Sequence, residues 1–275
     1  MELVSSELRL DYMRWRFLWV AISLALIGLS IFSWVRLGPE KYGVDFVGGA
    51  DVIVLFEKPV AIGDIRQALD RADISGASVQ AFEGDTHEFS IRLKAARDAD
   101  IAQRIDSALE KIEGNSFQIL KQDFVGPVIG EQIRQNGVKA LVIAILCLLV
   151  YISFRFEWRF AVGAIAALVH DIVVAAGIYV MSGREISAST LAALLTILGY
   201  SLNDTIIIYD RVRENVGLAQ RGERRKKAPG HELASLSFID LVNLSVNQTM
   251  SRTILTSLTT FFVVLMLYLM GGGEI

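Results

Sequence analysis

The sequence predicts a membrane α-helical bundle of about five spans that carries an α+β domain outside the membrane. Hydrophobic residues make up 53% of the 275 residues, and the mean hydropathy is +0.45, more apolar than a soluble domain of this length. From 37 to 136 the pattern changes from continuous apolar runs to alternating apolar and polar residues, which indicates a separate folded domain.

Five segments are long and apolar enough to cross a bilayer. A spanning helix needs roughly 17 to 25 mostly apolar residues, because the hydrocarbon core is about 30 Å thick and a helix rises about 1.5 Å per residue. The predicted spans are Phe17–Val35, Ala140–Phe154, Phe160–Met181, Ile186–Tyr209 and Thr253–Met270. The first span is too long for a signal-peptide core, and no small-residue cleavage site follows it, so we expect a retained anchor.

Positively charged residues in the short loops predict the orientation. One side collects cations before the first span (Arg9, Arg14, Arg16), in the second loop (Arg155, Arg159) and between the last two spans (Arg221, Arg224, Arg225, Lys226, Lys227). The opposite short loop has only Arg184, beside Glu185. We therefore expect a multi-pass membrane protein with its N-terminus in the cytoplasm and the region from Leu37 to Asn136 outside.

These patterns divide the chain into four parts. We expect a cytoplasmic segment at 1–16, the first transmembrane helix at 17–35, the external domain at 37–136, and the remaining four spans at 137–275 with a basic cytoplasmic loop at about 210–252.

The external domain has the pattern of four strands and two helices. Strands are predicted at Asp51–Glu57, Ser78–Phe82, His87–Lys94 and Ser116–Lys121, with a turn at Glu83-Gly84-Asp85 and helices at Ile62–Asp73 and Asp98–Ile112. The order βαββαβ predicts a ferredoxin-like arrangement, in which two helices cover one face of a four-stranded sheet.

The charge of this domain limits the classes of partner that we expect it to bind. Residues 37–136 hold 17 acidic and 11 basic residues, and the strands lack the stacking aromatic residues of an RNA-binding sheet. Nucleic acid is therefore not an expected partner. A docking surface for protein or peptide and a plain scaffold both remain open.

Ionisable side chains inside the predicted spans are the strongest functional candidates, because each costs a few kcal/mol or more to place in a membrane. His170 and Asp171 lie near the middle of the third span, and Arg252 opens the fifth. Tyr200, Asn203 and Asp204 of the fourth span share one helix face by spacing. Asp204 and Arg252 should then lie at similar depths on antiparallel helices.

A buried carboxylate beside a cation is suited to proton exchange, because burial and the neighbouring charge act on its protonation in opposite directions. Proton coupling at Asp204 is therefore the function that these residues support. The plainer alternatives are an interfacial cation at Arg252 and a polar cluster that locks helix packing at His170-Asp171. No metal site, cofactor site or catalytic residue is expected.

Several motifs then match a known family. They are Gly43-Val44-Asp45-Phe46-Val47-Gly48-Gly49, Val125-Gly126-Pro127-Val128-Ile129-Gly130, His170-Asp171, Gly199-Tyr200-Ser201-Leu202-Asn203-Asp204-Thr205, Tyr209-Asp210-Arg211-Val212-Arg213-Glu214-Asn215 and Asn247-Gln248-Thr249-Met250-Ser251-Arg252-Thr253. In this order and topology, the chain resembles the SecF family of the bacterial Sec protein-export system, a relative of the RND proton-driven transporters.

The resemblance implies six spans, a first external domain of ferredoxin-like type, and a partnership with SecD and through it with the SecYEG channel, with YajC and YidC as further partners. It implies that Asp204 and Arg252 serve proton transport and that the external domain handles the emerging preprotein. The chain departs from the family pattern by ending before a sixth span. The residues that match the family's glycine-rich motifs are Asp45, Phe46, Gly48, Gly49, Gly126, Pro127 and Gly130.

Three other functions are weighed against a proton-motive-force-driven helper of export. An RND-type carrier of lipid or small molecules would need a large apolar cleft that the external domain can hardly supply alone. An acid/base dyad of Asp171 and Asp204 for peptide hydrolysis is disfavoured by their different predicted depths. A scaffold for SecD without a proton role is the third. Membrane lipid is a partner in every case.

Overall fold

The computed structural model describes residues 10–74, 76–81, 87–94, 100–110, 112, 116–156, 158–224 and 232–270. The predicted turn at Glu83-Gly84-Asp85 and the cations Arg225, Lys226 and Lys227 lie outside the described residues.

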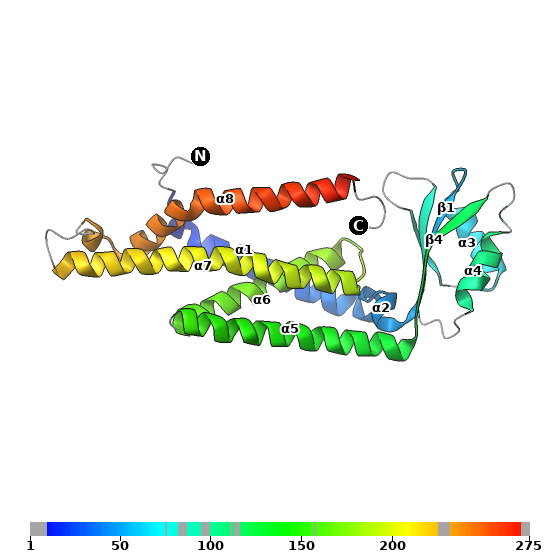
Figure 1. Cartoon of the computed structure of the whole chain (residues 1–275), viewed down its shortest axis with the longest axis horizontal. Helices are drawn as coiled ribbons and strands as arrows, with labels where there is room; N and C mark the ends of the chain where they lie inside the picture. The colour runs from blue at the N-terminus through cyan, green and yellow to red at the C-terminus, as the bar shows by residue number, and fades with distance from the viewer. Residues whose placement is uncertain are drawn as a thin grey trace.

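Five long helices in the described part of the chain are apolar and long enough to cross a membrane (Figure 1). They are α1 (Arg16–Arg36), α5 (Pro127–Arg155), α6 (Trp158–Met181), α7 (Ala188–Arg224) and α8 (Phe238–Met270). The helices lie side by side, with the sheet domain at one end and the α7–α8 connection at the other. The prediction of a multi-pass membrane bundle is confirmed.

The basic loop predicted at about 210–252 is mostly helical, which corrects the sequence-based boundary. Helix α7 continues to Arg224, and α8 already begins at Phe238. The two extensions bury residues at helical spacing against each other, namely Val212, Asn215 and Ala219 of α7 and Leu241, Ser245 and Thr249 of α8. Hydropathy finds only the apolar part of a helix, whereas these amphipathic extensions are stabilised by packing of one face.

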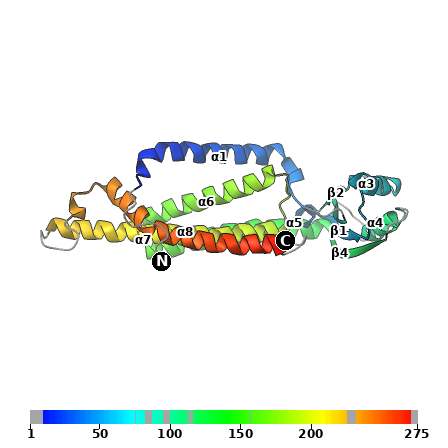
Figure 2. The same ribbon diagram turned by 90° about the horizontal axis from the view of Figure 1, so that it is seen from above.

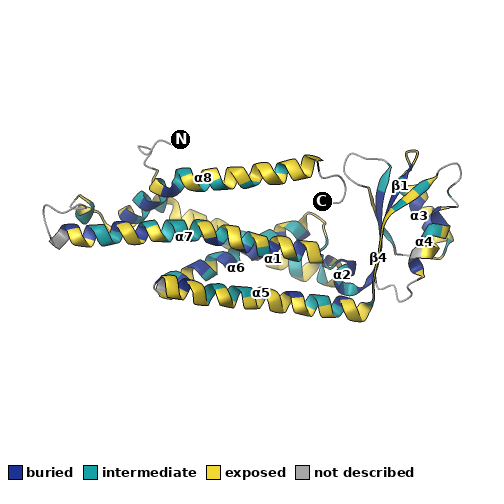
Figure 3. Cartoon of the chain, in the orientation of Figure 1, coloured by how far each residue is buried: buried dark blue, intermediate teal, exposed yellow. Residues whose placement is uncertain are grey.

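The bundle is only lightly packed within this chain. Figure 2 shows α6 lying between α1 and the helices α5, α7 and α8. In the most apolar window of each helix, 33% of the residues are buried for α6, 6% for α1 and 0% for α8. Exposed residues accordingly cover the outer faces of these helices in Figure 3. Helix α8 contacts the rest of the chain mainly through its first half, where Leu241, Ser245 and Thr249 are buried.

The predicted α+β domain, called the sheet domain below, contains the predicted elements in the predicted order. They are β1 (Gly49–Phe56), α3 (Ile62–Arg71), β2 (Ser78–Ala81), β3 (Glu88–Lys94), α4 (Ile101–Leu109) and β4 (Phe117–Val125). All neighbouring strands are antiparallel, in the order β2-β3-β1-β4. Strand β4 runs four residues beyond the predicted Lys121, because its second half continues to pair with the start of β1.

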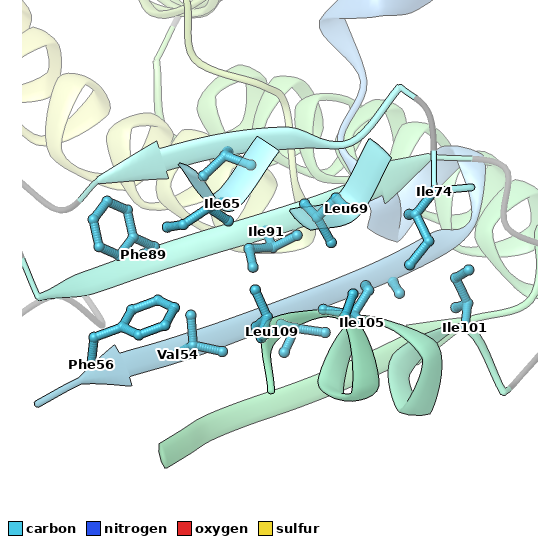
Figure 4. Packing of buried hydrophobic residues seen from close by; sticks show 14 residues of the cluster. Val54, Phe56, Ile65, Leu69, Ile74, Phe89, Ile91, Ile101, Ile105 and Leu109 are labelled. Atoms are coloured by element: carbon cyan, nitrogen blue, oxygen red, sulfur yellow. The ribbon is translucent and has the colours of Figure 1, made fainter. Parts of the chain in front are cut away.

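One closed hydrophobic core joins the sheet to α3 and α4 (Figure 4). Ile65 and Leu69 of α3, with Ile105 and Leu109 of α4, point at the inner face of the sheet, and each is no more than 1% exposed. The helical spacing i, i+4 in both helices places these residues on one face. Each fully buried side chain of this size contributes about 1.5–3 kcal/mol, so the domain has its own source of stability.

Short elements connect the domain to the bundle. The 3-10 helix η2 (Gly38–Lys41) and helix α2 (Val44–Val47) lead from α1 into β1, and β4 leads directly into α5. Two further 3-10 helices, η1 (Met13–Trp15) and η3 (Leu233–Ser235), lie at the opposite end of the bundle.

Candidate functional site

Asp204 lies on α7, half-buried and facing α8. Its carboxyl group interacts with the side chain of Thr256, which is itself half-buried on α8. Arg252 precedes Thr256 by one helical turn and is exposed. No ion pair joins Asp204 and Arg252, both of which are described. The two predicted proton-site residues therefore lie on packed helices, offset along α8 by about 6 Å, the rise of four residues.

A second polar cluster joins α6 to α7 next to this site. The Nδ1 atom of His170 lies 2.8 Å from Oδ1 of Asp171, and the Ser201 hydroxyl donates to Oδ2 of Asp171 over 2.5 Å. His170 Nε2 is buried and has no hydrogen-bond partner among the described residues. The cluster connects the two helices through side chains rather than through apolar packing alone.

This contact corrects the expected depths of the two carboxylates. Because Asp171 contacts Ser201, and Ser201 precedes Asp204 by three residues, Asp171 and Asp204 differ in depth by less than one helical turn. The depth argument against an acid/base dyad was therefore wrong. What separates the carboxylates is their partners: Asp171 is engaged by His170 and Ser201, while Asp204 faces Thr256.

Two residues expected beside Asp204 point elsewhere. Tyr200 is 56% exposed and Asn203 is also exposed, so their face of α7 is not covered within this chain. The polar contact near Asp204 is made instead by Ser201, a residue that was not predicted from the sequence to belong to the site. Ser201 precedes Asp204 by three residues, and residues at this spacing are neighbours on a helix surface, so helical periodicity could have identified it.

The motifs around Asn215 and Asn247 hold the extended ends of α7 and α8 together. The amide of Asn215, only 1% exposed, donates to Ser245 Oγ and to Gln248 Oε1, both over 2.9 Å. Arg211 Nε donates to the same Gln248 oxygen over 2.7 Å. Because buried polar groups need partners, this network fixes how α7 and α8 pack.

A different face of α8 binds the segment before α1. Asn247 accepts from the Leu10 N–H and donates to the Leu10 carbonyl oxygen, while Asn243 accepts from the Met13 N–H. The Asn243 amide also donates to Asp11 over 2.6 Å. The segment before α1 is thereby attached to α8.

The glycine-rich motifs form a tightly packed neck between the domain and the bundle, which we define as residues 43–49 and 126–130. Gly48 has φ +86°, and a Cβ there would lie 2.6 Å from the Cα of Pro127. A Cβ on Gly130 would lie 2.9 Å from the Gly48 nitrogen. Gly126 precedes α5, whose first residue is Pro127, a favoured position for proline. Side chains other than hydrogen cannot fit at these contacts.

Two motif residues of the neck, Asp45 and Phe46, act through their side chains. Phe46 is 5% exposed and packs with Val180 and Ile186 in a small cluster between α2 and the α6–α7 connection. Asp45 Oδ2 accepts a 2.8 Å hydrogen bond from the N–H of Ala188, the first residue of α7. Both residues thus attach the neck to the entrance of α7.

These features define a multi-pass membrane protein with an α+β domain at one end and polar clusters inside the bundle. Comparison with known proteins points to one family. Residues 104–275 match the family model described as "Protein export membrane protein SecD/SecF, C-terminal". The chain is 36% identical over 281 residues to the protein translocase subunit SecF of Vibrio alginolyticus, covering 100% of this chain and 83% of that protein. It is 37% identical to the SecF of Escherichia coli O157:H7, covering 95% of this chain and 77% of that protein.

A solved structure agrees with these relatives. The crystal structure of SecDF from Thermus thermophilus, described as a translocon-associated membrane protein, superposes with a TM-score of 0.80 at 33% identity. The match covers 98% of this chain and 35% of that chain, so this chain corresponds to about a third of that SecDF. The chain belongs to the SecF family, as its motifs predicted, and has a role in Sec protein export.

Proposed function

We propose that this chain is a SecF-type subunit that works with SecD, using the proton motive force to assist preprotein export across the bacterial cytoplasmic membrane. The observation that carries the proposal is the half-buried Asp204, which faces α8 one turn from Arg252. Asp204 is the proton site, and Arg252 is its switchable counter-ion. His170, Asp171 and Ser201 support it by joining α6 to α7.

The proton step follows from the offset between the two residues. In a low-dielectric setting a carboxylate without a cation binds a proton, and an approaching guanidinium favours its release. A shift of α8 by about one turn, a displacement known for packed helices, would bring Arg252 opposite Asp204. Such a shift requires the hydrogen bonds of Asn215 to the first half of α8 to open, whereas none of the most apolar window of α8 is buried against the chain.

The pairing with SecD is supported by the exposed faces of the spans. None of the most apolar window of α8 is buried, and only 6% of that of α1 is. Lipid covers part of such a surface, and we propose that SecD covers the rest. The SecYEG channel, YajC and YidC are proposed as further partners from family resemblance alone.

The proposed topology places the N-terminus in the cytoplasm and the sheet domain outside. Its support is the distribution of cations, since Arg14, Arg16, Arg155 and Arg221 lie at the end of the bundle far from the sheet. The sheet domain is proposed to be ferredoxin-like and to contact the emerging preprotein. Its support is the βαββαβ order and the antiparallel order β2-β3-β1-β4.

Export in inverted membrane vesicles tests the proton role. Asp204→Asn keeps the size and hydrogen bonding of the side chain but removes its ability to change charge, so we expect the stimulation of export by a proton gradient to be abolished. Arg252→Lys keeps the charge but loses the planar fork that holds a carboxylate through two hydrogen bonds, so we expect a partial loss.

Asp210→Asn is the matched control. Asp210 lies on the same helix, but its side chain is 58% exposed and its distance to Arg155 is 3.7 Å, so this variant should keep full stimulation. Insertion and SecD association are measured for each variant in the same vesicles. If a proton gradient stimulated export normally in Asp204→Asn, the proton role would be excluded and the scaffold function would remain.

A further inference from the structure

The start of α7 is attached to the neck by backbone and side-chain hydrogen bonds. The Ile186 N–H donates to the Lys41 carbonyl oxygen over 2.7 Å, and the Gly43 N–H donates to the Ile186 carbonyl oxygen over 2.9 Å. Two residues later, Asp45 accepts from the N–H of Ala188. The first N–H groups of a helix lack partners and form its positive end, so a carboxylate there stabilises the position of α7.

The residue before this joint reaches into the sheet domain. Glu185 Oε1 lies 2.8 Å from Nζ of Lys94, at the end of β3, and the Glu185 side chain is only 16% exposed. The other oxygen, Oε2, is 3.9 Å from Arg92 Nη1 and has no hydrogen-bond partner among the described residues. Glu185 is therefore held firmly by Lys94 and loosely by Arg92.

Arg92 interacts both with the domain and with the bundle. Its Nε donates to Asp51 Oδ2 over 3.3 Å within the sheet, while its Nη1 approaches Glu185. Asp51 is fixed in turn by the Ser90 hydroxyl at 3.0 Å. These contacts make the C-terminal end of β3 the place where the open face of the sheet meets the α6–α7 connection.

This contact is distinct from the covalent connections of the domain. The chain enters the domain from α1 through η2 and α2, and leaves it through β4 into α5. Neither path leads into α7, the helix that carries Asp204. Two carboxylates therefore link the domain and the neck to the entrance of α7: Glu185, held by Lys94 and more loosely by Arg92, and Asp45.

We infer that Glu185 and Asp45 are positioning residues that transmit movement of the sheet domain to α7, and through α7 to the proton site 16 residues further along. The inference rests on the proposed function for its consequence in export, but not for the mechanical link itself. A preprotein that displaces β3 would pull Glu185, and with it the first turn of α7. In the reverse direction, a shift of α7 would reorient the sheet.

Distance measurements by electron paramagnetic resonance test the link without a proton gradient. In a Cys147→Ser background of the full chain with SecD, one spin label is placed at the exposed Gln67 of α3 and another at the exposed Ala193 of α7. Glu185→Gln and Lys94→Gln should each broaden this distance distribution. The double variant should be no broader than either single variant, because both remove the same contact.

Two controls separate the link from a general loosening of the domain. A label pair at Gln67 and Val142 reports on α5, which is covalently attached to β4, and this distribution should stay narrow. Arg104→Gln removes hydrogen bonds from α4 to the carbonyl oxygens of Ala72 and Asp73, which lie within the domain, and it should change neither distribution. Unchanged widths in Glu185→Gln, equal broadening of both label pairs, or additive effects would overturn the inference.

Export measurements then test the consequence. We expect Glu185→Gln to reduce the gradient-dependent increment in export rate about fivefold, the lower end of what coupling between two sites is worth, with export in the absence of a gradient unchanged. Asp45→Ala should act in the same direction, and Asp45→Asn should restore the wild-type value, because asparagine caps a helix as well as aspartate does. If Asp204→Asn kept its gradient dependence, the proton role would fail while the distance result would still decide the link.

Discussion

The sheet domain and the membrane bundle obtain their stability in different ways. In the domain, fourteen side chains from both layers form one closed core, and several of them are completely buried. In the bundle, most apolar residues of α1 and α8 lie at the surface of the chain. The domain therefore has its own closed core, whereas the apolar faces of the bundle need lipid or another protein to cover them.

The largest expected effect breaks the domain core. Leu109→Ala removes a fully buried side chain of α4 and should lower the free energy of unfolding by about 2–5 kcal/mol. Leu258→Ala on α8, where the side chain is 41% exposed, should change the stability of the detergent-solubilised chain by far less. Urea unfolding of residues 38–136, which we expect to fold alone, and of the full chain measures both. Equal losses would remove the distinction between the two regions.

A smaller effect is expected where two spans cross closely. A Cβ on Gly177 of α6 would collide with the Ser30 side chain and lie 2.7 Å from the Ser30 Cα on α1. Gly177→Val should therefore destabilise the solubilised bundle by about 1–3 kcal/mol through overpacking. Gly28→Val is the control, because a Cβ at Gly28 on the same helix as Ser30 meets nothing within 4 Å. Thermal melting that ranks the two variants alike would contradict close packing of α1 on α6.

The smallest effect concerns an exposed ion pair of the domain. Lys121 Nζ lies 2.9 Å from Asp123, and the hydrogen bond to that carboxylate raises the pKa of Lys121 above its ordinary value of 10.5. Since the folded pKa is raised, the pair stabilises the domain below pH 10.5, and this contribution is lost as the pH rises through the folded pKa. Both side chains are about half exposed, so Lys121→Gln should cost at most about 0.5–1 kcal/mol near neutral pH.

Urea unfolding of the isolated domain measures this pH dependence. The difference between wild type and Lys121→Gln should shrink to nothing in strongly alkaline solution. A difference that grew with pH would show that Lys121 acts through packing and not through charge.

The neck shows how far local sequence rules reach. The glycine motif at Gly48 and the Gly126-Pro127 start of α5 could be read from the sequence, because only glycine tolerates a backbone with φ +86° and proline is favoured at a first helical position. The contact between the two motifs could not be predicted, since they are separated in the chain by the whole sheet domain. The environment of Lys41 could not be predicted from the sequence either. Its ammonium is buried against Trp34 and donates to the Gly38 carbonyl oxygen over 2.5 Å. Burial, and then the nearby Arg134, lower the pKa of Lys41.

By itself the sequence determined the apolar helices, the order of the strands and helices along the chain, and which ionisable residues those helices contain, because these follow from hydropathy and periodicity within short segments. Only the tertiary structure decided which of those residues meet. Asp171 bonds to Ser201, Asp204 faces Thr256 one turn from Arg252, and Glu185 binds Lys94 of a distant strand. The physical reason is that the rotation and axial offset of each helix are fixed by packing against its neighbours, and packing is not encoded in the periodicity of one segment.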